Sequence, residues 1–304
     1  MSSFQLRRCE PRDLAAAAEV VAAHERACRG ESAYSLADLE DEWRTTNLAE
    51  HTWVALDGDR VVGYGHSSDL GELWRAEAYV HPGVFGRGLG TQLAARLEDE
   101  ASAGGAKRLQ NVVLETDTPA RFLLTALGYH EVRRFRELRI DLEDAPRAPV
   151  WPAGLRGTLF DRAVDASAFH AAQQEAFADH WEFTPRSFES WSQFHLEKPA
   201  FDPSLWTVAR NGSAIVGGAI CRLEAYGGGW IDVLFTRAPW RRRGVGEALV
   251  AASFARLWER GQPSIGLGVD VQSDTGAFRL YERMGMRPGW SGVTFEKALG
   301  AGAA

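Results

Sequence analysis

The sequence predicts an α/β fold of the layered α+β kind, formed twice along the chain, each copy a twisted mixed sheet flanked by helices. Three observations predict it. The chain has 304 residues, about twice the commonest domain size. The order of predicted strands and helices in the first half recurs in the second half, and a proline-rich connection lies between the two halves.

Local signals predict the elements of the first half. Residues 4–10 suit a strand, and Asp13 suits the N-cap of the alanine-rich helix that follows. A hairpin turn is indicated by Asp57-Gly58-Asp59, and Asn211-Gly212 gives the same signal in the second half. The other predicted elements of the first half are a helix over 36–45, strands over 52–56, 60–67 and 73–80, a helix to about residue 103, a strand over 111–116, a helix over 119–127 and a strand over 132–142.

The repeat is visible residue by residue around a glycine-rich turn. In the first half a strand leads through residues 83–90 into a helix, and in the second half a strand leads through residues 239–246 into a helix. Four residues recur at an offset of 156: Trp74, Arg87, Gly88 and Gly90 match Trp230, Arg243, Gly244 and Gly246. Downstream the offset is 157: Asp117, Ala120 and Gly128 match Asp274, Ala277 and Gly285. So many matches indicate a duplicated domain.

The segment between the copies reads as an extended linker. Residues 143–152 contain three prolines and show little periodicity. We therefore expect an N-terminal domain over residues 1–146 and a C-terminal domain over residues 147–304.

Composition excludes several classes of protein. The net charge of −7, with acidic and basic residues interspersed, argues against a nucleic-acid-binding protein, which needs a concentrated basic face. The three cysteines, Cys9, Cys28 and Cys221, form no pair with metal-ligand spacing, so we expect no metal site and a reducing compartment. The N-terminus lacks the apolar stretch of a signal peptide, and no apolar run could span a bilayer. We expect a cytoplasmic protein that does not bind membranes.

The glycine-rich turn of the second half has the chemistry of a phosphate site. It reads Arg241-Arg242-Arg243-Gly244-Val245-Gly246, at the end of a strand and the start of a helix. First-turn amides of a helix have no intrahelical partners and attract an anion, and glycines allow close backbone approach. The turn lacks the Gly-Lys-Ser/Thr of a nucleotide-binding loop and the six-residue dinucleotide fingerprint. A basic, solvated turn capped by glycines is the alternative interpretation.

This pattern resembles the acetyl-CoA pyrophosphate loop of the GNAT superfamily, R-x-x-G-x-G. About thirty residues later the chain reads Asp274-Thr-Gly-Ala277-Phe-Arg-Leu280-Tyr281-Glu-Arg-Met-Gly285, which is similar to the family signature N-x-x-A-x-x-L-Y-x-x-x-G except for Asp at its first position. The resemblance implies that acetyl-CoA is the cosubstrate, bound partly by a splayed strand before the loop. The matching positions expected to bind it are Leu234, Phe235, Thr236, Arg241, Arg242, Arg243, Gly244, Val245, Gly246, Glu247, Asp274 and Ala277.

The first copy departs from the family pattern at two positions. Phe85 stands where the second copy has Arg241, and Leu124 stands in place of Tyr281. An anion nest is still expected there, formed by Gly86, Arg87, Gly88 and Gly90. We therefore expect a degenerate first copy and a catalytic second copy, a layout similar to that of mycothiol synthases.

The resemblance also assigns candidate catalytic residues. Tyr281 would donate a proton to the leaving CoA sulfur, since a phenol is protonated at neutral pH. An alkyl ammonium has a pKa near ~10.4, so the amine acceptor needs a base or a desolvating site. Asp232 is the expected base or water-relay group, and Glu224 on the preceding strand is the rival. The alternative interpretations are a core aromatic for Tyr281 and an arginine-paired or solvated carboxylate for Asp232 and Glu224.

The expected function is N-acetyltransfer from acetyl-CoA to a primary amine of a small molecule. In the family the first two helices shape the acceptor pocket, and here their aromatic residues are expected to be mostly core. These residues are Phe177, His180, Trp181, Phe183, Phe188, Trp191 and Phe194. A protein or peptide N-acetyltransferase and a non-catalytic CoA sensor are the alternatives. The protein would be a monomer with an internal pseudo-dimer, or a homodimer.

Overall fold

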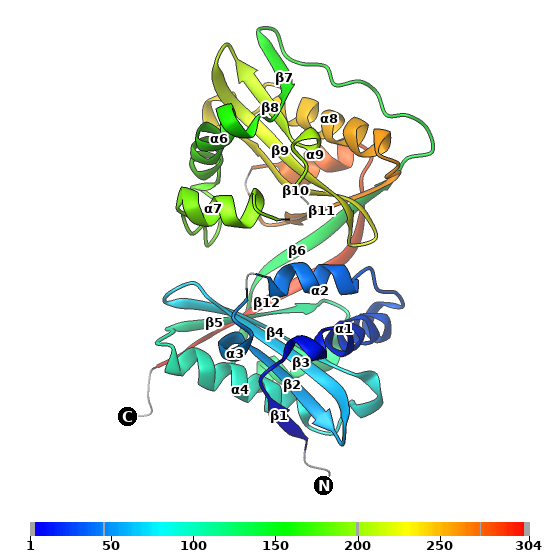
Figure 1. Ribbon diagram of the computed structural model, residues 1–304, viewed down its shortest axis with the longest axis vertical. Helices are drawn as coiled ribbons and strands as arrows, with labels where there is room; N and C mark the ends of the chain where they lie inside the picture. Colours follow the sequence, from blue (N-terminus) through cyan, green and yellow to red (C-terminus); the bar gives the residue numbers. More distant parts are fainter. Residues whose placement is uncertain (1–3, 45, 199–200, 274, 301–304) are drawn as a thin grey trace. The chain divides into compact units, whose positions relative to one another are not determined.

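A computed structural model describes residues 4–44, 46–198, 201–273 and 275–300 of the chain (Figure 1). The chain divides into two compact units. Unit 1 consists of Met1–Phe135 and Trp290–Ala304, and unit 2 consists of Arg136–Gly289. Among the helices described, none is both long enough and apolar enough to cross a membrane.

Unit 1 is a mixed sheet with helices packed on it. Its strand order is β1-β2-β3-β4-β5-β12, in which β4 and β5 run parallel and the other registered pairs run antiparallel. The strands are β1 (Gln5–Arg7), β2 (Thr52–Asp57), β3 (Arg60–Asp69), β4 (Leu73–Val80), β5 (Arg108–Leu114) and β12 (Arg287–Ala298). The helices are α1 (Leu14–Arg29), α2 (Leu36–Trp43), α3 (Leu48–His51), α4 (Leu89–Ala103) and α5 (Thr118–Ala126).

Unit 2 repeats this plan with the strand order β6-β11-β10-β9-β8-β7. The strands are β6 (His130–Asp141), β7 (Leu155–Leu159), β8 (Thr207–Asn211), β9 (Ala214–Ala225), β10 (Gly228–Thr236) and β11 (Ser264–Asp270). The helices are α6 (Arg162–Phe177), α7 (Phe188–His195), α8 (Val245–Glu259) and α9 (Ala277–Arg283). The layered α/β class expected from the sequence is confirmed.

Local chemistry sets the turns and helix starts. Gly58 and Gly212 have φ of 62° and 57°, the left-handed conformation that two-residue hairpin turns need. Asp117 caps α5 by accepting from the Ala120 amide at 3.0 Å. In unit 2, Asp161 caps α6 in the same way. Because each device acts within a few residues, the sequence predicted these elements closely.

The two copies exchange their final strands. The last strand of the first copy, β6, neighbours β11 in unit 2, whereas the last strand of the second copy, β12, pairs with β5 in unit 1 from Gly292↔Leu114 to Ala298↔Arg108. The sequence boundary after residue 146 therefore follows the repeat, while the compact units follow the pairing of these strands. Val293 and Phe295 of β12 are buried in the unit 1 core beside Trp74.

The central strands of each unit separate along their length. In unit 1 the register of β4 with β5 covers Leu73–Ala76, and in unit 2 the register of β10 with β11 covers only Gly229 and Trp230. The rest of β10 pairs with β9 alone among the described strands, with an irregularity between Ile231 and Val233. The backbone groups on the other side of β10 therefore face a gap between diverging strands.

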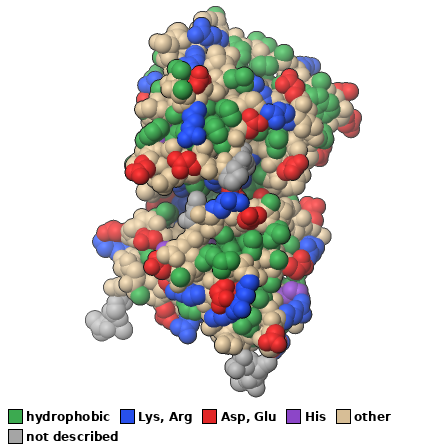
Figure 2. All heavy atoms as spheres, viewed as in Figure 1, with side chains coloured by type: hydrophobic (Ala, Val, Ile, Leu, Met, Phe, Trp, Pro, Cys, Tyr) green, Lys and Arg blue, Asp and Glu red, His purple; other side chains and the backbone are tan. Residues whose placement is uncertain are grey.

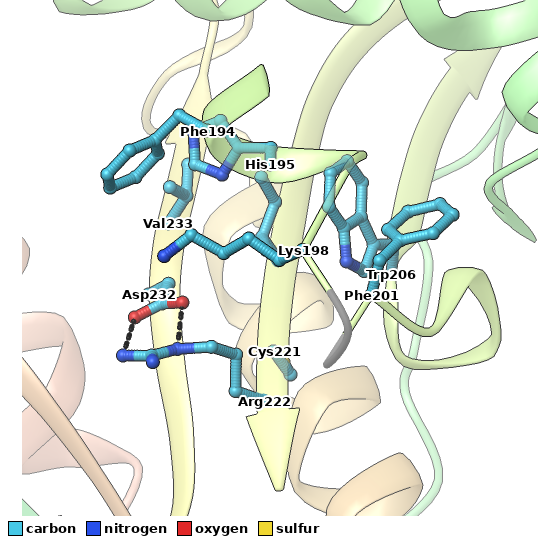
Figure 3. Close-up of a pocket in the computed structure, with 10 residues that line it drawn as sticks. Phe194, His195, Lys198, Phe201, Trp206, Cys221, Arg222, Asp232 and Val233 are labelled. Atoms are coloured by element: carbon cyan, nitrogen blue, oxygen red, sulfur yellow. Dashed lines mark hydrogen bonds and ion pairs between the residues drawn. The ribbon is translucent and has the colours of Figure 1, made fainter. Parts of the chain in front are cut away.

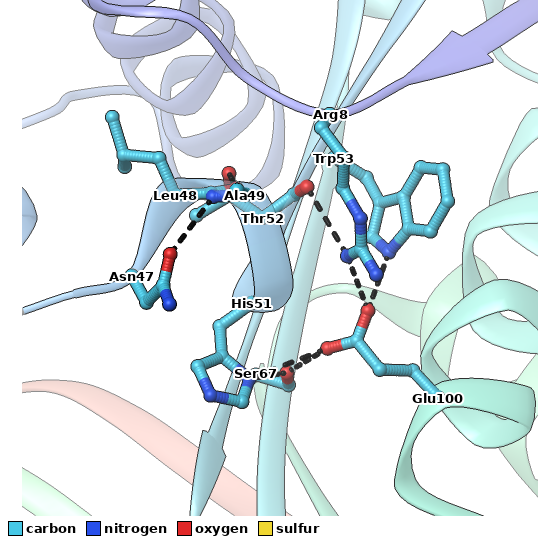
Figure 4. Close-up of polar contacts among 9 residues, drawn as sticks. All are labelled: Arg8, Asn47, Leu48, Ala49, His51, Thr52, Trp53, Ser67 and Glu100. Carbon is cyan, nitrogen blue, oxygen red and sulfur yellow. Dashed lines mark hydrogen bonds and ion pairs between the residues drawn. The ribbon is translucent and has the colours of Figure 1, made fainter. Parts of the chain in front are cut away.

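A buried carboxylate fixes α4 to the sheet of unit 1 (Figure 4). Glu100 accepts hydrogen bonds from Trp53 Nε1 at 2.8 Å, from the Ser67 hydroxyl and from the Arg8 guanidinium. His51 Nδ1 lies 3.5 Å from the same carboxylate. A buried charge is tolerated when such donors surround it, so this network is structural.

The exchanged strand gives a test of the fold. Phe295→Ala should lower the free energy of unfolding by about 3–5 kcal/mol, because the change leaves a cavity in the unit 1 core. Chemical denaturation followed by tryptophan fluorescence would measure the loss. Val150→Ala is the control, since Val150 is 85% exposed and its truncation should change stability little. Equal stability of the two variants would contradict the packing of β12 in unit 1.

Candidate functional site

The glycine-rich turn of unit 2 forms an anion nest. Arg242 and Gly244 both adopt left-handed conformations, with φ of 59° and 85°, immediately before α8. No side chain caps the first turn of α8. Successive backbone amides in this conformation converge on an anion, and the helix dipole adds to the attraction. In unit 1, Gly86 and Gly88 have φ of 73° and 83° before α4, so both copies form the same turn.

The Arg241 guanidinium is directed at the protein rather than at the nest. It donates to the Ala176 carbonyl at 2.7 Å, to the Thr236 carbonyl at 3.2 Å and to the Asp179 carboxylate. The hydrogen bond from Arg241 lowers the pKa of Asp179. Arg241 therefore ties the turn to α6 and to the end of β10, and it positions the nest.

The other charged residues of this turn are exposed. Arg242, Arg243 and Glu247 all lie in solvent, and the Arg243 guanidinium stands 5.4 Å from the centre of the Trp240 ring. Two of the three predicted arginines are thus free of the core and stand beside the nest.

The end of β10 offers its backbone and one hydroxyl. The Phe235 ring is buried against Phe169, with ring centres 5.1 Å apart, so only the Phe235 backbone could face a ligand. Leu234 is half-buried. Thr236 Oγ1 is buried without a hydrogen-bond partner among the described residues. A buried hydroxyl left unpaired is uncommon in proteins and suits a site that a ligand completes.

The first turns of α8 and α9 carry small residues. Val245 is buried, and a Cβ on Gly246 would lie 3.0 Å from Leu280 Cδ2, so α8 packs closely on α9 at this glycine. Ala277 begins α9 and is partly buried against the core. Asp274, predicted to contact the coenzyme, lies outside the described residues.

Tyr281 on α9 combines a buried ring with a protonated hydroxyl. The residue is 6% exposed, and burial raises its pKa to about 12. No charge or hydrogen bond from another described residue contributes to this shift. The phenol therefore keeps its proton at neutral pH and can donate it.

A cavity of about 230 Å³ opens between α7 and strands β9 and β10 (Figure 3). Aromatic and charged side chains share its walls. The lining residues are Phe194, His195, Lys198, Phe201, Trp206, Ile220, Cys221, Arg222, Asp232 and Val233. In the close-up the Lys198 ammonium points toward the Asp232 carboxylate.

The structure separates the two candidate bases. Asp232 lines the cavity at the irregularity of β10, where Arg222 Nη2 donates to its Oδ1 at 2.9 Å and Arg222 Nε contacts its Oδ2. Glu224 is exposed near the end of β9 with φ of 51°, and it does not line this cavity. Asp232 is therefore paired with an arginine, as the alternative interpretation of the sequence proposed. Its carboxylate nevertheless borders the cavity.

Sequence reasoning missed His195, Lys198 and Trp206 as cavity residues. Burial and nearby cations, among them Arg186 and Lys198, lower the pKa of His195 to about 3, so the imidazole is neutral. The signal for His195 was the aromatic run of α7, of which Phe194 borders the cavity while Trp191 is fully buried core. Lys198 and Trp206 lie beyond that helix and gave no signal. Sequence position does not reveal which face of a short helix meets a cavity.

In unit 1 the corresponding positions are occupied differently. Arg87 bonds Asp57 at 2.8 Å and lies over the Phe4 ring, so its charge is already paired. Phe85 is 43% exposed, and Leu124 is buried. Gly90 lies in the first turn of α4, and a Cβ built on it would lie 3.2 Å from Leu123 Cδ2. Unit 1 thus keeps the nest and lacks a phenol at the position of Tyr281.

The charges are mixed on the face that Figure 2 shows. On the face in Figure 2, acidic and basic side chains are interspersed over each unit. Such a surface fits the small net charge found in the sequence.

Comparison with known proteins agrees with these features. The profile of the Acetyltransferase (GNAT) family matches residues 18–129 and 168–286, one region in each copy. A mycothiol acetyltransferase of Thermobispora bispora is 31% identical over 236 residues, covering 75% of this chain and 77% of that protein. A mycothiol acetyltransferase of Parafrankia sp. is 30% identical over 322 residues, covering 96% and 97%.

Solved structures share the fold over nearly the whole chain. A GCN5-related N-acetyltransferase from Sphaerobacter thermophilus superposes with a TM-score of 0.86 at 30% identity, covering 99% of this chain and 97% of that one. A tandem GNAT protein from the clavulanic acid biosynthesis pathway superposes with a TM-score of 0.77 at 16% identity, covering 99% and 100%. At that identity the second likeness concerns the fold alone.

A glycine-to-alanine substitution tests the nest. Gly244→Ala should destabilise unit 2 by about 1–2 kcal/mol, because a Cβ is strained at φ of 85°, and should weaken coenzyme A binding. Thermal denaturation and calorimetric titration would measure the two effects. Gly268→Ala is the matched control, since Gly268 has ordinary φ and open space around its Cβ direction. Equal behaviour of both variants would argue against a strained nest at Gly244.

Proposed function

Because the chain belongs to the GNAT acetyltransferase family, we propose that unit 2 transfers the acetyl group of acetyl-CoA to a primary amine of a small molecule. The observation that carries the proposal is the separation of β10 from β11 directly ahead of an uncapped helix. The free edge of β10 is followed in the sequence by the N-terminus of α8. This combination suits an extended ligand that ends in a pyrophosphate.

The residues of unit 2 fit acetyl-CoA. Backbone amides of residues 242–247 would hold the pyrophosphate, with Arg242 and Arg243 adding charge. The backbone of residues 234–236 would pair with the pantetheine arm, and Thr236 Oγ1 would gain the partner it lacks. When bound, acetyl-CoA supplies an acyl group activated as a thioester.

Tyr281 and Asp232 divide the proton chemistry in this proposal. Tyr281 keeps its proton because burial raises its pKa, so it would supply a proton to the departing sulfur. Asp232 forms an ion pair with Arg222 and borders the cavity, so its carboxylate would attract an ammonium and accept a proton from it, directly or through water. Glu224, in solvent near the end of β9, is less well placed for this role.

The cavity favours a small polar acceptor with an apolar part. Phe194 and Trp206 supply flat apolar walls, and Lys198 and Arg222 supply cationic groups. Since relatives about 30% identical are named mycothiol acetyltransferases, the amine that is acetylated in mycothiol is the first acceptor to assay.

Removal of one hydroxyl tests the general acid. Tyr281→Phe should lower kcat by about 100-fold or more, with coenzyme A affinity unchanged, since the ring stays in place. With a pKa of about 12, the hydroxyl loses its proton only as the pH rises toward 12, so Tyr281 should not limit activity below about pH 11. Steady-state kinetics against pH would measure both. Tyr129→Phe, which loses a bond to Glu98 in unit 1, is the control and should leave kcat unchanged.

The base is tested by a pair of amide substitutions. Asp232→Asn should depress turnover and change its dependence on pH, because an amide cannot accept the proton. Glu224→Gln should have neither effect if Asp232 is the base. Asp144→Asn, on the exposed linker, controls for loss of one negative charge. An unchanged pH profile in Asp232→Asn would remove Asp232 from the mechanism, and a changed one in Glu224→Gln would assign the role to Glu224.

A further inference from the structure

In unit 1 a single imidazole spans the gap between the separating strands. His24 Nδ1 lies 3.0 Å from the carbonyl oxygen and 3.3 Å from the amide nitrogen of Val80, the last residue of β4. On the other side of the ring, His24 Nε2 lies 2.9 Å from Asp117 Oδ2, in the segment that follows β5. The side chain of α1 therefore bridges from one strand to the continuation of the other.

The bridge is buried and charged. His24 is 8% exposed and Asp117 is 5% exposed. Burial alone would lower the pKa of His24, but hydrogen bonds with Asp117 and Cys28 raise it to about 10, and the pKa of Asp117 is lowered in return. The rings of Tyr79 and Phe85 stand edge-on to the imidazole, at 5.6 and 5.7 Å between centres. At neutral pH the pair is an imidazolium and a carboxylate in a largely dry site.

Unit 2 has small residues where unit 1 has this bridge. Helices α1 and α6 both have 16 residues and both follow an aspartate, Asp13 or Asp161. Aligned on these aspartates, His24 corresponds to Ala172 and Cys28 corresponds to Ala176. A methyl group cannot reach across the gap that the imidazole spans.

The carbonyl at the end of the central strand is bonded by a different side chain in each unit. Val80 and Thr236 are equivalent in the repeat, at the offset of 156. The Thr236 carbonyl accepts from Arg241 on the glycine-rich turn, whereas Phe85, which replaces Arg241 in unit 1, has nothing to donate. In unit 1 the bond to the carbonyl comes from His24 on α1, whereas the aligned position of α6 in unit 2 is Ala172.

We propose that the His24–Asp117 bridge closes the cleft of unit 1 to acyl-CoA, so that the chain binds one coenzyme, in unit 2. The proposal rests on the proposed function of unit 2. A pantetheine arm in unit 1 would need the backbone edge at Val80 and the space beside Asp117, and the His24 side chain stands at the first, bonded to the Val80 carbonyl, and bonds Asp117 at the second. Breaking a buried ion pair leaves an uncompensated charge, which makes displacement of the bridge unfavourable.

A metal ion is the competing occupant of this cluster. Ligand atoms of His24, Cys28 and Asp117 lie within 4.8 Å of one another. In a tetrahedral zinc site with bonds near 2.0 Å, ligand atoms lie roughly 3.3 Å apart. The 2.9 Å between His24 Nε2 and Asp117 Oδ2 is shorter than this and matches a direct hydrogen bond. The geometry therefore favours the direct bridge over a shared metal.

The test is the stoichiometry of coenzyme A binding to the full chain, measured by calorimetry. We expect one coenzyme per wild-type chain. Gly244→Glu should abolish that binding and Gly88→Glu should leave it intact, because these are matched positions with φ of 85° and 83° in the two turns. Two coenzymes per chain, or loss of binding in Gly88→Glu alone, would overturn the closed cleft and leave the acetyltransferase proposal standing. No binding to the wild type would instead count against the proposed function.

Two further measurements keep the test sharp. The double variant His24→Ala with Cys28→Ala reproduces the alanines of unit 2 and should raise the stoichiometry to two; a folded double variant that still binds one would show that His24 is not the barrier. In wild-type protein, the imidazole NMR signals of His24 should remain those of an imidazolium at pH 8 and should not move with saturating coenzyme A. Shifted signals, or stoichiometric zinc that is lost in His24→Ala, would overturn the direct bridge.

Discussion

A strand that leaves its neighbour must satisfy its backbone groups elsewhere, and this requirement shapes both halves of the molecule. Buried N–H and C=O groups without partners cost about as much as a lost hydrogen bond. Strand β10 separates from β11 after Trp230, and β4 separates from β5 after Ala76. In unit 2 the Thr236 carbonyl at the end of this edge accepts from Arg241, and the acetyltransferase proposal gives the rest of the edge to the coenzyme. Unit 1 fills the same place with His24.

The duplication therefore produced two solutions to one structural problem. Phe85, in the place of Arg241, offers no donor on the turn, and His24 on α1 bonds the Val80 carbonyl in its stead. Loss of the phenol at Leu124 accompanies this change. Unit 1 consequently keeps the backbone geometry of the nest, while His24 bonds the Val80 carbonyl and Asp117.

Unit 1 nevertheless depends on the second copy for its sheet. Strand β12 comes from the end of the chain and completes the edge beside β5, with Phe295 in the core. Strand β6 makes the reciprocal contribution beside β11. Each compact unit therefore contains strands from both copies of the sequence.

The cavity of unit 2 brings charge and aromatic surface to the irregular part of β10. The irregularity between Ile231 and Val233 coincides with Asp232, whose carboxylate is held by Arg222 from β9. Two aromatic side chains line the cavity: Phe194 from α7 and Trp206 from the segment before β8. A paired carboxylate in such surroundings keeps a fixed orientation, which suits recognition of a cationic amine.

The sequence by itself determined the features that depend on short-range physics. Hairpin glycines, two short motifs and the 156-residue repeat indicated the turns, the family and the duplication, because each operates within a few residues or by direct comparison of two segments. Asp13, predicted to cap the first helix, instead bonds Arg7 and makes no side-chain cap bond. The tertiary structure decided what depends on distant partners. Arg241 meets Asp179 across 62 residues, and His24 meets Asp117 across 93. Exchange of β6 and β12, like the placing of Asp232 rather than Glu224 at the cavity, follows from strand pairing that no local signal encodes.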